Sequence, residues 1–273
     1  MATTRRKPSP YILNCLPSPK LEKNWTLETA VAAGVAAAPS PRSTAAAAAA
    51  GIDLREPWWT VGDQGATGSC VGWGTADAVL RWHFVKAGRL TRTERLSARY
   101  VWMASKETDP YTTRPTSFIE SDGTWLTAAL DVARKFGVVT DKVLPFKLGG
   151  QSQMYGDSAN TFYALAAQRR IASYFNLGRD LAKWRAWLQN NGPILTRLDV
   201  DPAFMDATTT KGKLDTYTPG AGLGGHCVAL VGYINGRFIV RNSWGTGWGD
   251  KGFAYAADSY AQPAFTEAFG VTL

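Results

Sequence analysis

One stretch near the start of the chain decides how it folds: Gln64-Gly65-Ala66-Thr67-Gly68-Ser69-Cys70, followed by Val71-Gly72-Trp73-Gly74-Thr75-Ala76. A glycine-rich loop ends in a cysteine, and apolar residues then recur at helical spacing. Cys70 is therefore predicted to lie at the N-terminus of a buried helix. Unpaired backbone N–H groups and the helix dipole stabilise a thiolate there, so the stretch predicts a nucleophilic cysteine.

A second stretch near the C-terminus supplies partners for this thiol. It contains Gly225-His226-Cys227 and, after a hairpin signal, the run Asn242-Ser243-Trp244-Gly245-Thr246-Gly247-Trp248-Gly249. Most unpaired cysteines are inert core residues, so Cys70 alone would prove little. A nucleophilic thiol needs a base within hydrogen-bonding reach, and the base needs a third group that fixes its ring. Cys70, His226 and Asn242 fit these three roles in that order.

Together the two stretches resemble the papain-like cysteine peptidases, from about Asp53 to the C-terminus. The run that begins at Asn242 carries the most specific part of the resemblance. The resemblance implies that Cys70 is the nucleophile, that His226 acts as base and then acid, and that Asn242 orients the imidazole. It also implies that Gln64 donates its amide to an oxyanion hole completed by the Cys70 backbone N–H.

Four further residues are candidate substrate contacts. By the resemblance, Gly123 pairs its backbone with an extended substrate, and the alternative is a plain turn before a helix. Gly68, Gly225 and Trp244 are placed in the same cleft, and Trp244 is expected to shield the bond between Asn242 and His226.

Two positions depart from the family pattern. Val71 stands where a tryptophan usually follows the nucleophile, so the primed-side wall of the cleft is expected to differ. Gly225 replaces the Asp or Asn that commonly precedes the histidine, which changes the surroundings of His226. In both features the sequence resembles the disulfide-poor bacterial members of the family.

The order of the secondary-structure patterns predicts an α+β protein. Helical patterns after the Cys70 helix cover 96–108, 125–136 and 179–191. Strand patterns follow at 194–200, 226–234, 237–242, 252–257 and 267–273, and Asn235-Gly236 is a hairpin signal. With the resemblance, this order predicts a two-lobe papain-like fold, in which a helical lobe faces an antiparallel β-barrel-like lobe across the active-site cleft.

The chain is expected to divide into an extension at 1–52 and a peptidase domain at 53–273, which suits the length of 273 residues. Within the extension, 39–50 is a linker rich in alanine and proline, and 21–38 contains a predicted short helix opened by Asn24 or Thr26.

The extension is shorter than the inhibitory prosegment that is usual in the family, and it lacks the motif of that prosegment. Residues 1–10 are predicted to be a tail. Apolar residues such as Tyr11 and Trp25 favour a docked, possible short inhibitory segment at roughly 11–30, with Trp25 and its neighbours in or near the cleft.

Charge and hydropathy narrow the expected partners and location. About half of the net charge of +8 lies in the extension, and no long basic run or RNA-binding motif accompanies it, so no nucleic acid is expected. Arg5-Arg6-Lys7 is followed by Pro8 and Pro10 rather than by the apolar region of a signal peptide, and no stretch is predicted to cross a membrane. A cytoplasmic location is the default expectation, and non-classical export is the alternative.

The chain has only three cysteines, Cys15, Cys70 and Cys227, which favours a reducing compartment. Cys227 is expected to be a small buried residue, with a Cys70–Cys227 disulfide as the alternative. His83 is expected to be an ordinary core or helix-surface histidine. Ligands at zinc spacing are missing, so neither a metal nor another cofactor is expected.

The predicted function is hydrolysis of peptide bonds in a protein or peptide substrate, through a thiolate–imidazolium pair and an acyl-enzyme. Two alternatives remain. An acyl-transfer enzyme such as a deamidase, amidase or transpeptidase would use the same three residues. A non-catalytic binding module on the same fold would be expected to lack one of them.

Overall fold

The structure, a computed structural model, describes residues 11–36, 51–111, 120–147 and 159–273. The predicted tail at 1–10 and the whole predicted linker at 39–50 lie outside the described residues.

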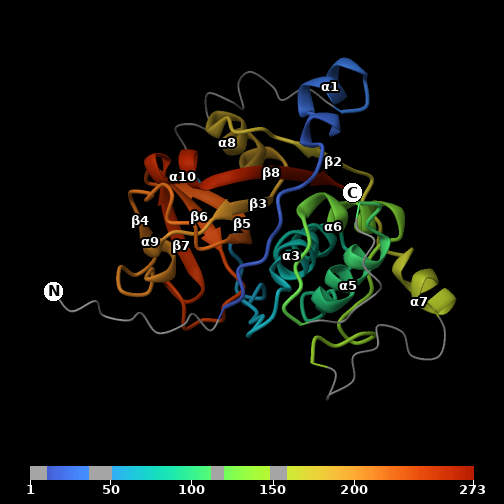
Figure 1. Cartoon of the computed structure of the whole chain (residues 1–273). Helices are drawn as coiled ribbons and strands as arrows, with labels where there is room; N and C mark the ends of the chain where they lie inside the picture. Colours follow the sequence, from blue (N-terminus) through green and yellow to red (C-terminus); the bar gives the residue numbers. More distant parts are fainter. Residues whose placement is uncertain (1–10, 37–50, 112–119, 148–158) are drawn as a thin grey trace.

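The helices gather on one side of the molecule, around the helix that begins at Cys70 (Figure 1). This helix runs without a break through α3 (Cys70–Trp73), the π-helical segment η2 (Gly74–Leu80) and α4 (Arg81–Lys86). Against it pack α5 (Ala98–Thr108) and α6 (Leu126–Lys135), while α7 (Ala159–Ala166) lies at the periphery. The helices predicted at 96–108 and 125–136 are therefore confirmed.

The other side is built on an eight-stranded sheet in the order β2-β8-β3-β5-β6-β7-β4, with β1 also paired to β5. Neighbouring strands are antiparallel, except that β4 runs parallel to β7. The strands are β1 (Ile52–Asp53), β2 (Ser173–Asn176), β3 (Ile194–Asp199), β4 (Lys213–Leu214), β5 (Gly225–Ile234), β6 (Arg237–Arg241), β7 (Phe253–Ala257) and β8 (Phe265–Thr272). Shorter helical elements accompany the sheet: η1 (Leu21–Lys23), α1 (Leu27–Ala32), α8 (Leu181–Asn190), α9 (Pro202–Met205) and α10 (Asp258–Ala264).

The five predicted strands and the helix predicted at 179–191 are present, and so is the hairpin between β5 and β6. Asn235 and Gly236 have φ of 50° and 76°, the left-handed conformation that a two-residue hairpin turn needs. The predictions missed β1, β2 and β4, and also α7, α9 and α10. Most of these elements are too short to show a periodic pattern, and α10 contains Pro263.

Strand β5 positions the site, because it pairs with β1, β3 and β6 and its first eight residues are buried. The register pairs Ala229 with Arg241, so His226 at the start of β5 comes beside the residues that follow β6. The Cys70 helix approaches β5 closely at Gly74, where an added Cβ would lie 2.5 Å from Cys227 Sγ. This approach brings Cys70 next to His226.

The N-terminal segment passes between the helices and the sheet before it reaches α1 (Figure 1, blue). Thr26 caps α1, because its side chain accepts the Thr29 N–H and the Thr29 side chain accepts the Thr26 N–H. Of the two predicted starts of this helix, Asn24 and Thr26, the second is therefore confirmed. Asn176 in β2 donates its backbone N–H to the Trp25 carbonyl at 2.9 Å. The prediction that Trp25 lies in or near the cleft is wrong, because it sits at the edge strand β2 and is 50% exposed.

Asp77 in η2 ties the two sides together through buried ion pairs. Its carboxylate lies 3.3 Å from Arg81, 3.0 Å from Arg95 and 2.6 Å from Arg241 at the end of β6. Burial lowers the pKa of Arg241 to about 10, so its guanidinium stays charged at neutral pH and depends on Asp77 for its countercharge.

We expect Asp77→Asn to lower the free energy of unfolding by about 3–5 kcal/mol, because it leaves buried arginines without a countercharge. Urea unfolding measures this change. The control is Glu56→Gln, which breaks a partly exposed pair with Lys86 (2.5 Å) and should cost about 1 kcal/mol or less. Equal losses in the two variants would contradict the role given to Asp77.

Candidate active site

His226 is held by the amide of Asn242. The distance from His226 Nε2 to Asn242 Oδ1 is 2.7 Å, and Oδ1 also accepts the Ser243 backbone N–H at 2.8 Å. Because an oxygen with no hydrogen faces the ring, Nε2 must carry the proton and donate it. This bond fixes the ring and leaves Nδ1 as the nitrogen available to Cys70.

Aromatic rings enclose this pair. The Trp244 ring lies 4.6 Å from the His226 ring, and Phe204 packs at 5.8 Å from His226 and 5.4 Å from Trp244. His226 is fully buried and Asn242 is 3% exposed. Trp244 therefore shields the bond between Asn242 and His226 from water. A hydrogen bond in such a buried place is stronger than it is in solvent.

Cys70 is the first residue of its helix and is fully buried. A hydrogen bond with the Cys15 thiol, followed by a hydrogen bond and charge interaction with His226, holds the pKa of Cys70 well below its usual value although burial opposes this. The backbone of Cys227 adds a smaller contribution of the same sign. Hydrogen bonds to a charged form favour it, so this arrangement stabilises a thiolate.

Gln64 is oriented by Ser243 from the other lobe. Ser243 Oγ donates to Gln64 Oε1 at 2.8 Å, and the Gln64 backbone N–H donates to the Ser243 carbonyl at 2.8 Å. Gln64 Nε2 donates one hydrogen to the Thr67 carbonyl at 2.8 Å. Its second amide hydrogen has no acceptor within the described ranges.

The structure thus brings Cys70, His226, Asn242, Gln64 and Trp244 together, as the sequence predicted. Ser243 and Phe204 were missed. Ser243 lies in the sequence motif that begins at Asn242, but the motif alone does not show that this serine binds both Asn242 and Gln64.

The three candidate glycines differ in what they contact. A Cβ on Gly123 would lie 1.5 Å from the Asn14 carbonyl oxygen, and one on Gly225 would lie 2.2 Å from the Cys15 carbonyl oxygen. Both glycines therefore admit the N-terminal segment at close range. Gly68 instead packs against backbone of its own lobe, with Ser121 O at 2.5 Å from the added Cβ.

The N-terminal segment occupies the space beside Cys70 and is bonded to both walls. Cys15 N–H donates to the Gly225 carbonyl and Leu16 N–H to the Thr124 carbonyl, each at 3.0 Å. Asn14 Nδ2 donates to the Ser121 carbonyl at 3.0 Å. The ring of Tyr11 stacks on Trp244, with centroids 4.0 Å apart and planes 2° from parallel.

Two more contacts complete the docking of this segment. Arg197 Nε donates to the Cys15 carbonyl at 3.0 Å, and Ser18 N–H donates to Glu267 Oε1 at 2.8 Å. Docking was predicted for about 11–30, and the structure limits the contact with the site to residues 11–18. The roles of Cys15 and Arg197 were missed, because the contact joins residues 182 positions apart.

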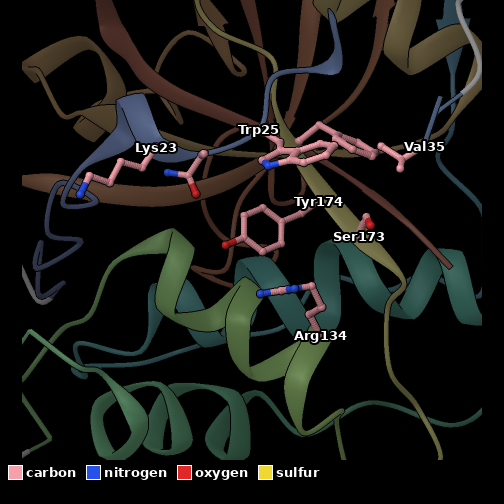
Figure 2. Close-up of a pocket in the computed structure, with 8 residues that line it drawn as sticks. Lys23, Trp25, Val35, Arg134, Ser173 and Tyr174 are labelled. Carbon is pink, nitrogen blue, oxygen red and sulfur yellow. The ribbon is translucent and has the colours of Figure 1, made fainter. Parts of the chain in front are cut away.

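Trp25 lines a separate surface pocket (Figure 2). Its indole lies over Tyr174, with Arg134 beyond that ring and Lys23 and Val35 on either side. None of the predicted site residues lines this pocket.

The described ranges contain no group of three or more His, Cys, Asp or Glu side chains placed to hold a metal ion. Within the same part of the chain, no helix combines the length and the apolar character that a membrane span needs.

Known proteins with similar sequences agree with this geometry. The model of the papain family cysteine proteases matches residues 48–266. Cathepsin B-like CP3 of Giardia intestinalis is 26% identical over 230 residues, which are 78% of this chain and 71% of that protein. Cathepsin B-like CP2 of the same organism is 28% identical over 140 residues, 48% of this chain and 45% of that protein. The chain thus spans under half the length of CP2.

Among solved structures, xylellain, a cysteine protease from Xylella fastidiosa, has the same fold. It superposes with a TM-score of 0.76 at 20% identity, over 100% of this chain and 99% of that one. These findings confirm the predicted papain-like fold of two lobes. The family model covers most of the chain, so the chain belongs to the papain family of cysteine proteases.

Proposed function

We propose that this chain hydrolyses peptide bonds through Cys70, and that residues 11–18 keep it latent until they leave the cleft. One observation carries the first part: Asn242 holds the His226 ring through Nε2, and His226 is one of the groups that lower the pKa of the Cys70 thiol. A base that is oriented by a third group and a nucleophile at its other nitrogen are the parts that nucleophilic acyl transfer needs.

The mechanism begins with a thiolate–imidazolium pair at Cys70 and His226. The thiolate attacks the carbonyl carbon of an extended peptide, and the C–N bond then breaks as His226 Nδ1 gives its proton to the leaving amine. Water, deprotonated by the now neutral imidazole, releases the acyl group from Cys70. Asn242 keeps Nε2 protonated and the ring in one plane throughout.

Gln64 is suited to stabilise the oxyanion of the tetrahedral intermediate. Ser243 holds Oε1 and Thr67 takes one Nε2 hydrogen, so the amide has a fixed orientation and a second hydrogen to donate. The Cys70 backbone N–H, at the first turn of its helix, is the other donor. Donors that are oriented before the reaction stabilise developing charge without reorganisation.

Latency is supported by the contacts of the N-terminal segment. Asn14 and Cys15 lie against Gly123 and Gly225, where the backbone of a substrate is expected, and Cys70 is fully buried beneath them. A substrate can reach the thiolate only when this segment has been displaced or cut. Several solved structures with the same fold are of precursor forms, among them procathepsin L2 of Tenebrio molitor.

The first prediction concerns the charge state of Cys70. At neutral pH, where an unperturbed thiol of pKa near 8.5 is mostly protonated, the wild type should show thiolate absorbance in the ultraviolet that Cys70→Ala lacks. Cys15→Ala removes the thiol that donates to the thiolate, so the pKa of Cys70 should rise and the absorbance at neutral pH should fall.

Cys227→Ala is the control for this measurement, because it keeps the backbone that contacts Cys70 and should keep the absorbance. Identical spectra for the wild type and Cys70→Ala near neutral pH would contradict a lowered pKa.

The second prediction concerns access to the site. The double variant Tyr11→Ala/Asn14→Ala removes a stacked pair and a hydrogen bond, together about 2 kcal/mol. An epoxysuccinyl probe should therefore label Cys70 roughly 30-fold faster than in the wild type. Mass spectrometry locates the adduct, which Cys70→Ala should lack.

Trp25→Ala removes an aromatic ring from the same extension outside the cleft, and it should label at the wild-type rate. Equal rates for the double variant and the wild type would show that residues 11–18 do not limit access.

The third prediction concerns Asn242. In the Tyr11→Ala/Asn14→Ala background, Asn242→Ala should lower kcat/KM for a fluorogenic peptide by about 10²-fold, because the imidazole loses its orientation. Asn191→Ala, at the exposed end of α8, should leave kcat/KM unchanged. A value for Asn242→Ala equal to that of Asn191→Ala would remove Asn242 from the mechanism.

A further inference from the structure

The three cysteines of the chain are all buried in one place, although they lie far apart in sequence. Cys70 is the proposed nucleophile, and Cys227 packs against Gly74 where the helix meets β5. Cys15 comes from the N-terminal segment and is 2% exposed. The mechanism proposed above uses Cys70 but gives no chemical task to Cys15.

Cys15 is held beside the active site by its own backbone. Its N–H is bound by the Gly225 carbonyl, and its carbonyl is bound by Arg197 Nε. Arg197 is itself fixed, because Nη1 donates to Thr266 Oγ1 at 2.8 Å and lies 2.9 Å from Asp199. With the main chain tied on both sides, the Cys15 side chain is held in the same buried cluster as Cys70 and interacts with its thiol.

We propose that Cys15 and Cys70 form a reversible disulfide, which fastens residues 11–18 over the active site under oxidising conditions. A disulfide needs the two sulfurs at about 2 Å. Because the Cys15 backbone is fixed at Gly225, next to His226, and its side chain shares a buried cluster with Cys70, we expect a local displacement to be enough to bring the two sulfurs together. The proposal rests on the proposed function in one respect: the disulfide would abolish activity because it consumes the nucleophile.

A peroxide is the oxidant class that the chemistry of this pair favours. The Cys70 thiolate attacks one oxygen of hydrogen peroxide, the O–O bond breaks, and Cys70 becomes a sulfenic acid as hydroxide leaves and takes the proton of the His226 imidazolium to become water. The Cys15 sulfur then attacks the Cys70 sulfur, and water leaves with the proton of Cys15. Two thiols are oxidised by two electrons and one peroxide is reduced to two waters. A dithiol reductant reverses the change by thiol–disulfide exchange.

The environments of the two sulfurs suit this order of events. Cys70 is the sulfur stabilised as a thiolate, and thiolates are the form that peroxide oxidises. Burial, followed by the interactions with Cys70, raises the pKa of Cys15, which therefore stays protonated and donates to its partner. Once Cys70 is a neutral sulfenic acid, its charge no longer helps to hold Cys15 protonated, so Cys15 can lose its proton and attack the Cys70 sulfur.

The test treats the reduced full-length chain with hydrogen peroxide and maps its peptides by mass spectrometry without reduction. The expected product is a Cys15–Cys70 linked peptide, two hydrogens lighter than the separate peptides, that disappears after dithiothreitol. Oxidation should abolish labelling of Cys70 by the epoxysuccinyl probe. Dithiothreitol should then restore labelling, and the restored amount should be at least tenfold higher in the wild type than in Cys15→Ser.

Two variants decide between the possible links. Cys15→Ser keeps the backbone contacts and a hydroxyl donor but cannot form the disulfide, so its Cys70 should proceed to the irreversible sulfinic acid. Cys227→Ala should still give the Cys15–Cys70 peptide. A Cys70–Cys227 or Cys15–Cys227 peptide as the main product, or equal recovery of labelling in Cys15→Ser and wild type, would overturn the proposal.

Failure of this proposal can be told from failure of the proposed function, because peptide mapping needs no activity. A linked peptide in a chain that cleaves no peptide substrate, even as the Tyr11→Ala/Asn14→Ala variant, would refute hydrolysis and support the disulfide. Peptide cleavage by that variant, with no linked peptide from the oxidised wild type, would refute the disulfide alone.

Discussion

The close contact between the Cys70 helix and strand β5 is the constraint on which the rest of the structure depends. Gly74 leaves no room for a side chain beside Cys227, so the backbone of the helix lies directly against the Cys227 side chain of the central strand. Asp77, one turn further along, then reaches Arg241 at the end of β6. A helix from one lobe is thereby fixed against two strands of the other. The proposed nucleophile at the start of that helix and the histidine at the start of β5 are both positioned by this one contact, and the β5–β6 register adds Asn242.

The same region of the structure stabilises the Cys70 thiolate and holds the N-terminal segment over it. The backbone of the N-terminal segment pairs with the carbonyls of Thr124 and Gly225, and two glycines make room for it. Its Cys15 thiol then contributes the largest favourable influence on the thiolate of Cys70. A group that stabilises the Cys70 thiolate therefore belongs to the segment that we propose keeps the site latent. Release of the segment would expose Cys70 and would also withdraw this hydrogen bond, so the latent and open forms should differ in the pKa of the nucleophile.

Much of the fold and of the candidate site could be predicted from the sequence, because the patterns that indicate them lie in consecutive residues. The loop before Cys70, the run after Asn242 and the Asn235-Gly236 turn each carry their information in consecutive residues, and the longer helices and strands show clear periodicity. What escaped prediction depends on contacts between distant residues. The sequence around Cys15 does not indicate that Arg197 binds the Cys15 carbonyl. Trp25 was misplaced because an apolar side chain fits a surface pocket at β2 as well as it would fit a cleft.

The central claim is that residues 11–18 lie in the cleft against Cys70, and amide hydrogen exchange of the reduced full-length chain tests it most directly. The amides of Cys15 and Leu16 donate to carbonyls of opposite walls. The account predicts that both exchange far more slowly than in an unstructured peptide of the same sequence, and that Tyr11→Ala/Asn14→Ala speeds both. Exchange of both amides at the unstructured rate in the wild type would mean that the segment does not occupy the site, and the account of latency would be wrong.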